Sequence, residues 1–262
     1  MNNVNKTLYI PLYGKNLVSQ RGILLRDPDA ERIWAAGGFP LKGKAKSKWL
    51  AYYMAMRASV FDEWTAGQLS RHPDATVLHL GCGLDSRCNR VSPGNALWFD
   101  VDFPDVIAER KRYFPESEAY RMIGADLREE NALAAVPRGG HGIVVMEGIS
   151  MYLSPEALQQ LLCRLKAHFG SISLLMDCYT ELAAKASKYK NPINDVGVFR
   201  VWGLDHPETI QGLTFLQEHD MTPAALIHRL PRKDRQIFQK IFAGGFAKKL
   251  YRLYEYTSSP IH

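Results

Sequence analysis

Val77-Leu78-His79-Leu80-Gly81-Cys82-Gly83-Leu84-Asp85-Ser86-Arg87 is an apolar run that leads into a Gly-x-Gly turn. The run predicts a buried strand over residues 76–80. The two glycines permit a tight turn and close approach of a ligand to the backbone at the carboxyl end of that strand. An acidic run, Trp98-Phe99-Asp100-Val101-Asp102, follows about one β-α-β unit later. Together the two stretches predict a binding site for a nucleoside-bearing ligand.

The turn departs from the dinucleotide-binding fingerprint, because Ser86 stands where that fingerprint has its third glycine. A pyrophosphate would meet a less open backbone at this position. A nicotinamide-dependent dehydrogenase has the same class of sheet, but this turn and the lack of an obvious hydride-site residue argue against it.

Asp102 lies 19 residues after Gly83, at the end of the second predicted strand. A carboxylate at that place can accept hydrogen bonds from both hydroxyls of a ribose. Asp100 competes for this role, because a spacing of two residues puts both side chains on the same side of a strand. We prefer Asp102, which is nearer the end of the strand.

Two further carboxylates follow the third and fourth predicted strands. Asp126 can accept the exocyclic amine of an adenine, and Leu127 beside it offers backbone and apolar contact. Glu147 would face the same edge, where a carboxylate stabilises an amine or a sulfonium. Taken singly, Asp126 also fits a helix cap and Glu147 a solvated loop. Their positions at the carboxyl ends of strands favour the ligand.

Strands and helices alternate between residues 75 and 178, which predicts a parallel sheet with right-handed crossovers. A Ser154-Pro155 pair marks one helix start, with serine as the cap and proline in the first turn. Further strands are expected at 96–101, 121–124, 142–146 and 172–176, with helices at 85–91, 104–114 and 155–168. Residues 213–216 and 250–256 resemble a closing pair of strands, with an amphipathic helix over 233–242 between them.

The remaining segments define the expected domains. Residues 1–74 are basic and mainly helical, and we expect them to form an N-terminal helical cap over the ligand edge. Residues 75–262 form the ligand-binding core, into which a helical lid is inserted at about 180–212. The four cysteines show no Cys-x-x-Cys pairing, so no metal site is predicted.

Composition narrows the partners. The chain has 262 residues and a formal charge of +6. It has no apolar run of membrane-spanning length and no signal-like segment, so we expect a cytoplasmic protein with no membrane contact. Lys and Arg concentrate at the two ends, which favours a small, acidic acceptor. The sequence has no basic stretch interleaved with aromatic residues, so we do not expect it to bind nucleic acid. The oligomeric state stays open.

These motifs, in this order and spacing, resemble the leucine carboxyl methyltransferase family, which includes bacterial polyketide O-methyltransferases of the tetracenomycin type. The resemblance spans roughly residues 9–256 and is carried by four stretches. They are Leu80–Arg87, Phe99–Ile107, Ala125–Arg128 and Glu147–Leu153. The resemblance implies a class I S-adenosylmethionine-dependent methyltransferase. Its fold would be α/β, with a Rossmann-like seven-stranded sheet, an N-terminal helical extension and an inserted lid segment.

The resemblance also assigns roles residue by residue. It implies that Gly81, in the turn with Gly83, lies against the amino-acid end of S-adenosylmethionine. Asp102 would hold the ribose, Asp126 with Leu127 the adenine, and Glu147 would lie near the methionine moiety. Arg57 matches an arginine that holds the cofactor carboxylate in the family, a role that suits the forked guanidinium. Lys15 is our candidate for a second basic partner.

We therefore expect an O-methyltransferase that acts on a carboxylate or a hydroxyl of a small molecule or natural product. A carboxylate acceptor needs no general base, since it is ionised at neutral pH. A hydroxyl would need one, and the candidates are His206 and Tyr152. The aromatic residues of the inserted segment fit either an acceptor wall or the core of the lid; they are Tyr179, Tyr189, Phe199 and Trp202. Two alternatives stay open: a methyltransferase for C-terminal carboxylates of proteins or peptides, and a non-catalytic S-adenosylmethionine-binding protein.

Overall fold

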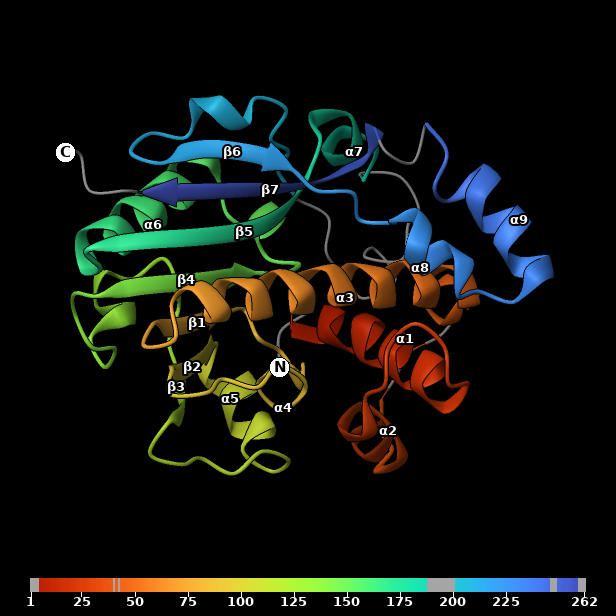
Figure 1. The fold of residues 1–262 in the computed structure, drawn as a ribbon, viewed down its shortest axis with the longest axis horizontal. Helices are drawn as coiled ribbons and strands as arrows, with labels where there is room; N and C mark the ends of the chain where they lie inside the picture. The colour runs from red at the N-terminus through yellow and green to blue at the C-terminus, as the bar shows by residue number, and fades with distance from the viewer. Residues whose placement is uncertain (1–4, 40, 42, 188–200, 246–248, 259–262) are drawn as a thin grey trace.

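The computed structural model describes residues 5–39, 41, 43–187, 201–245 and 249–258. Its centre is a seven-stranded sheet with strand order β3-β2-β1-β4-β5-β7-β6 (Figure 1). The strands are β1 (Thr76–Leu80), β2 (Leu97–Asp102), β3 (Tyr120–Gly124), β4 (His141–Met146), β5 (Ser171–Tyr179), β6 (Thr214–Glu218) and β7 (Tyr251–Ser258).

The sheet confirms the predicted arrangement. β1 to β5 pair in parallel, and β7 runs antiparallel to both of its neighbours, β5 and β6. β1 has the predicted bounds. β5 differs most from its predicted bounds. It was expected to end at Met176 but continues to Tyr179, so Asp177 lies inside the sheet. Pairing with β7 explains this extension, since Tyr179 lies opposite Tyr251.

The helices are α1 (Tyr9–Gln20), α2 (Pro28–Ala35), α3 (Lys48–Arg71), α4 (Arg87–Arg90), α5 (Pro104–Arg110), α6 (Pro155–His168), α7 (Glu181–Ala186), α8 (Ala224–His228) and α9 (Arg232–Ile241). Ser154 caps α6 as predicted, with its side chain accepting a hydrogen bond from the Ala157 N–H. α4 is shorter than predicted, because Asp85 accepts a hydrogen bond from the Arg87 N–H and so holds a turn before the helix. The predicted helix over 104–114 ends at Arg110.

Helices cover both faces of the sheet. Side chains of a parallel strand alternate between the two faces, so each strand contributes to two cores. On one face α3 packs Phe61 and Trp64 against Val77 and Ile143. On the other face α6 packs its leucines against the alternate residues of the same strands, such as Leu78. Figure 1 shows α3 crossing the sheet in front, over β4 and β1.

The N-terminal residues are helical, as the sequence predicts. α1 lies beside the N-terminal part of α3, which extends beyond the carboxyl ends of the parallel strands (Figure 1). α8 and α9 join them: Phe238 of α9 is buried in one cluster with Tyr52 and Met56 of α3. Five short 3-10 helices complete the described residues: η1 (Asn5–Leu8), η2 (Gly43–Lys46), η3 (Glu130–Leu133), η4 (Ser150–Tyr152) and η6 (Pro207–Thr209).

The middle of the predicted lid, residues 188–200, lies outside the described residues. α7 and η6 flank it. Within the described part of the chain, no helix is both long enough and apolar enough to cross a membrane.

Candidate active site

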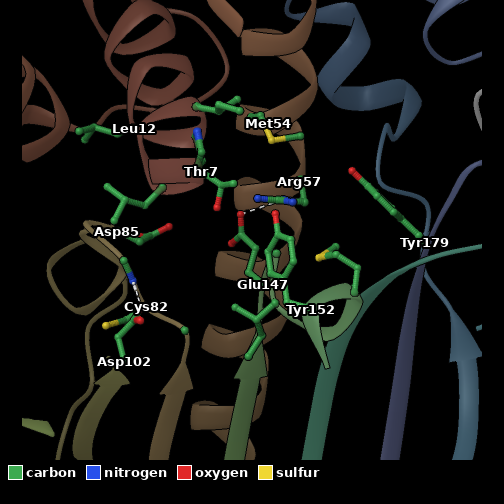
Figure 2. A pocket seen from close by; sticks show the side chains of 18 of the residues that line it. Thr7, Leu12, Met54, Arg57, Cys82, Asp85, Asp102, Glu147, Tyr152 and Tyr179 are labelled. Atoms are coloured by element: carbon green, nitrogen blue, oxygen red, sulfur yellow. Dashed lines mark hydrogen bonds and ion pairs between the residues drawn. The ribbon is translucent and has the colours of Figure 1, made fainter. Parts of the chain in front are cut away.

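A cavity of about 700 Å³ lies at the carboxyl ends of the parallel strands, with η1, α1 and α3 on its other side (Figure 2). One set of residues predicted from the sequence comes together in its lining: Arg57, Gly81, Gly83, Asp102, Asp126, Leu127, Glu147 and Tyr152. These residues are spread over almost a hundred positions of sequence. The topology brings them together because parallel strands end at one edge of the sheet.

The glycine turn presents bare backbone to this cavity. Gly81 and Gly83 have φ values of +66° and +52°, which side chains rarely tolerate. A Cβ atom on Gly81 would lie 2.0 Å from Cγ2 of Ile149. Leu8 of η1 covers Gly83 from the opposite side. The turn therefore requires glycine both for its conformation and for the close packing of Ile149.

Asp102 is held with its carboxylate in the cavity. Its two oxygens accept hydrogen bonds from the Gly83 N–H at 2.8 Å and from the Phe103 N–H at 2.7 Å. Burial raises the pKa of Asp102 to about 6, although these two N–H groups partly offset the effect. The side chain is thus oriented and still has lone pairs for a ligand.

Asp100, the competing candidate, is engaged elsewhere. It is fully buried, forms an ion pair with Arg110, and accepts a hydrogen bond from the Tyr120 hydroxyl at 2.6 Å. These contacts tie β2 to β3 and α5. Asp102 lines the cavity, and Asp100 does not.

Asp126 and Leu127 line the cavity beside Arg128. Both carboxylate oxygens of Asp126 contact the Arg128 guanidinium, and Arg128 is largely exposed. An amine that binds Asp126 must share the carboxylate with Arg128 or displace it. Because this ion pair lies near solvent, separating it costs little, about 0–1 kcal/mol.

Arg57 is buried in the wall of the cavity, beside Glu147 and between Asp102 and Tyr179 (Figure 2). Its Nε donates to Glu147 Oε1 at 2.9 Å, and its Nη1 donates to Asp177 Oδ2 at 2.9 Å and to the Tyr251 hydroxyl at 2.8 Å. A guanidinium has five N–H donors, and these contacts occupy three of them. In the described part of the chain, Nη2 donates to no residue, so one edge of the fork is available to an anion.

Glu147 lies between two arginines. Its other oxygen accepts a hydrogen bond from Arg87, a fully buried residue of the glycine motif for which the motif alone indicates no role. Burial alone would raise the pKa of Glu147, but Arg57 and Arg87 outweigh it and lower the pKa to about 2. Glu147 is therefore ionised and held at two points.

Lys15 of α1 reaches the same region and forms a buried ion pair with Asp85. Both residues line the cavity. A lysine ammonium has three N–H donors, so Lys15 can contact Asp85 and still donate to a ligand. Lys15 thus lines the same cavity as Arg57, and its role as a second basic partner of the cofactor stays a prediction.

Asp177 and Tyr251 were missed by the sequence analysis. Asp177 stands alone in an apolar stretch, Leu174-Leu175-Met176-Asp177-Cys178. A charged residue inside a buried strand can indicate a functional site. Because the predicted strand ended at Met176, Asp177 was expected to lie in a loop. Tyr251 gives no comparable signal, because it comes to Asp177 only through the pairing of β7 with β5.

Of the two candidate general bases, Tyr152 lies in the cavity lining and His206 does not. Burial raises the pKa of Tyr152, which disfavours its phenolate. The His206 side chain is 72% exposed and lies 3.2 Å from Glu208. The proposal of His206 as a base is therefore not carried further. Its segment packs on the edge of the sheet, where the Tyr256 hydroxyl donates to the Pro207 carbonyl.

The four aromatic residues predicted for the inserted segment differ in whether they line the cavity. Tyr179 lines the cavity and points into it from the end opposite Asp102 (Figure 2). Trp202 is absent from the described lining, while Tyr189 and Phe199 lie outside the described residues. The lining also contains apolar residues that the sequence did not indicate: Leu50, Met54, Met151, Phe242 and Leu250.

Comparisons with known proteins extend these observations. The family model for leucine carboxyl methyltransferase matches residues 4–166. The tetracenomycin polyketide synthesis O-methyltransferase TcmP of Streptomyces glaucescens is 38% identical over 173 residues, which cover 64% of each chain. The match thus spans less than two thirds of that relative.

Solved structures support the fold. A DUF574 family protein of Streptomyces avermitilis superposes with a TM-score of 0.57 at 13% identity, covering 81% of this chain and 86% of that one. Magnesium protoporphyrin IX methyltransferase of Synechocystis PCC 6803 gives 0.52 at 12% identity, with coverage of 88% and 93%. The sheet is the Rossmann-like sheet of class I methyltransferases. With the family model matching well over half of its residues, the chain belongs to the leucine carboxyl methyltransferase family.

Proposed function

We propose that this protein is an S-adenosylmethionine-dependent O-methyltransferase with a small-molecule acceptor. The observation that carries the proposal is one continuous cavity with two chemically different ends. One end has the glycine turn, Asp102 and Asp126. The other has aromatic and apolar side chains. Such a cavity can hold a nucleoside-bearing methyl donor and an apolar acceptor side by side.

The residues at the cofactor end fit S-adenosylmethionine. The glycine turn lines the cavity with its backbone, and Asp102 offers oriented acceptors to the two ribose hydroxyls. Asp126 and Leu127 suit the adenine. At the methionine end, Glu147 suits the ammonium group, and Nη2 of Arg57 suits the carboxylate.

When bound, S-adenosylmethionine supplies a sulfonium methyl group that is already electrophilic. The protein has to orient the acceptor and keep water out. Apolar side chains serve both purposes at the acceptor end. They come from α3, η4, the end of β5, the end of α9 and the start of β7: Leu50, Met54, Met151, Tyr179, Phe242 and Leu250.

We further propose that the methylated group is a carboxylate on an aromatic or otherwise apolar molecule. A carboxylate is ionised at neutral pH, so the protein has no proton to remove. The tyrosines at this end have pKa values raised by burial, as for Tyr152, and so make poor bases. The basic ends of the chain also favour an acidic acceptor. The Streptomyces glaucescens relative is named for tetracenomycin polyketide synthesis, and a natural product of that kind supports this proposal.

The first experiment is isothermal titration calorimetry with S-adenosylhomocysteine, followed by methyl transfer from radiolabelled S-adenosylmethionine. The acceptor panel contains anthraquinone-2-carboxylate, 1-naphthoate, 1-naphthol, 1-naphthylamine and a peptide ending in leucine. We expect label on the aromatic acids, released as methanol by mild alkali because a methyl ester hydrolyses and an aryl ether does not.

Each other outcome has a defined meaning. Label only on the naphthol or the amine would make the carboxylate assignment wrong. Label only on the peptide would favour a C-terminal carboxyl methyltransferase. Binding of S-adenosylhomocysteine with no transfer to any acceptor would favour a non-catalytic binding protein. No binding at all would overturn the proposed function.

A further inference from the structure

We infer that Asp177 and Tyr251 are positioning residues, which fix Arg57 so that one edge of its guanidinium faces the carboxylate of the bound cofactor. The inference rests on the proposed function, since it specifies how the methionine end of the cofactor is held. Neither residue needs to touch the cofactor. Asp177 is fully buried and does not line the cavity.

Asp177 orients two parts of the site at once. Its Oδ1 accepts a hydrogen bond from the Gly148 N–H at 2.6 Å, and its Oδ2 accepts one from Arg57 Nη1 at 2.9 Å. Gly148 has a φ of +76° and lies in the cavity lining, directly after Glu147. One carboxylate therefore fixes both the turn that carries Glu147 and the arginine that binds it.

Tyr251 completes the arrangement. Its hydroxyl donates to Asp177 Oδ2 at 2.5 Å and accepts from Arg57 Nη1 at 2.8 Å. Both hydrogens of Nη1 are thus occupied, as is the single hydrogen of Nε by Glu147. Only the Nη2 edge remains. Its two N–H groups can donate to one or to both oxygens of a carboxylate. The direction of that edge follows from the three contacts on the rest of the guanidinium.

The substitution Asp177→Asn tests this arrangement sharply. Both carboxylate oxygens act as acceptors, and an asparagine has only one acceptor oxygen. In one orientation its amide NH₂ would face Arg57 Nη1, and in the other it would face the Gly148 N–H. Either orientation sets two donors against each other, while the volume of the side chain is unchanged. Tyr251→Phe is the milder variant, since it keeps the ring and removes only the hydroxyl.

The readout compares two ligands that differ at the methionine end. S-adenosylhomocysteine carries the amino-acid carboxylate, and 5′-methylthioadenosine lacks it but keeps the adenine and ribose. We expect Asp177→Asn to raise the Kd for S-adenosylhomocysteine about tenfold or more, and Tyr251→Phe about threefold to tenfold. Both variants should bind 5′-methylthioadenosine within about twofold of the wild type, because the contacts of Asp102 and Asp126 are intact.

Glu255→Gln is the matched control. Glu255 is also a buried carboxylate of β7, but it lies four residues further along the strand than Tyr251 and does not line the cavity. It accepts hydrogen bonds from Trp64, Gln217 and His219. Its replacement should cost stability and leave the affinity ratio of the two ligands unchanged. Melting curves for all three variants record how much each loses in stability.

The outcomes separate the inference from the proposed function. If the wild type binds neither ligand, the proposed function fails. If the wild type binds S-adenosylhomocysteine and both variants bind it equally well, the inference is wrong. It is also wrong if the variants lose both ligands to the same degree, as a general loss of structure would cause. Should Asp177→Asn fail to fold, the ligand ratio of Tyr251→Phe decides alone.

Discussion

Replacement of Asp102 by alanine should weaken the binding of S-adenosylhomocysteine by about two orders of magnitude. In the proposed complex the ionised carboxylate accepts two hydrogen bonds from the ribose. A hydrogen bond to a charged group contributes about 1.5–3 kcal/mol. Two bonds to one carboxylate are not additive, so we take about 3 kcal/mol for the pair, which corresponds to about 10²-fold in Kd.

The assay is calorimetric titration of wild type and variant with S-adenosylhomocysteine and with its 2′-deoxy analogue. The variant should lose less affinity for the analogue, because one of the two bonds is already missing. Asp105→Ala is the control, since Asp105 is an exposed carboxylate three residues away that does not line the cavity. An affinity within twofold of the wild type would refute the ribose role, as would equal losses for both ligands.

The same carboxylate predicts a pH dependence. Burial raises the pKa of Asp102 to about 6 in the free protein. Below that pH the group is protonated and accepts fewer hydrogen bonds, so affinity should fall by up to about tenfold between pH 7 and pH 5. Because this pKa is raised, the charged carboxylate costs the free protein stability as the pH rises through the interval from about 4 to about 6. Asp102→Ala should flatten the pH profile of binding.

Three further substitutions test other parts of the site. Arg57→Lys keeps the charge and loses the fork, so we expect S-adenosylhomocysteine to bind at least about tenfold more weakly while 5′-methylthioadenosine is unaffected, both measured by calorimetry; equal binding of the first ligand would contradict a two-point carboxylate contact. Gly81→Ala places a Cβ 2.0 Å from Ile149 at a φ of +66°, and should destabilise the protein by roughly 2–4 kcal/mol in denaturant melts. An unchanged midpoint would show that the turn relaxes. His206→Ala should leave both cofactor affinity and methyl transfer unchanged, because the side chain is exposed and does not line the cavity; a large loss of transfer would restore it as a candidate base.

Much of the sheet could be predicted because a parallel strand covered on both faces appears as an apolar run. Val77 to Leu80 and Ile143 to Met146 have no polar alternation to confuse with a helix, apart from His79. Their carboxyl ends then fix where Gly81, Asp102 and Glu147 must gather. The positions of these residues in the cofactor half of the site could therefore be predicted from the strand pattern alone.

The acceptor half could not be predicted in the same way. Phe242 and Leu250 reach the cavity through the packing of α9 and β7, and nothing in their local sequence marks them. Arg87 was visible in the glycine motif, but its bonds to Glu147 and Asp62 depend on three separate elements. Long-range ion pairs of this kind leave no periodic pattern in the sequence.

The family match covers the cofactor half of the site in full and the acceptor half only in part. The cofactor candidates, from Arg57 to Glu147, all fall within residues 4–166, where the family model matches. The acceptor end draws partly on that range, through Leu50, Met54 and Met151, and partly on residues beyond it: Tyr179, Phe242 and Leu250. Membership of the family therefore bears mainly on how the methyl donor is held, whereas acceptor choice also depends on a part of the chain that the model does not cover. Asp177 and Tyr251 belong to that second part and yet bind Arg57 of the first. Substitutions at the acceptor end that disturb these two residues should consequently alter cofactor affinity as well. Acceptor selection and binding of the methyl donor are therefore coupled.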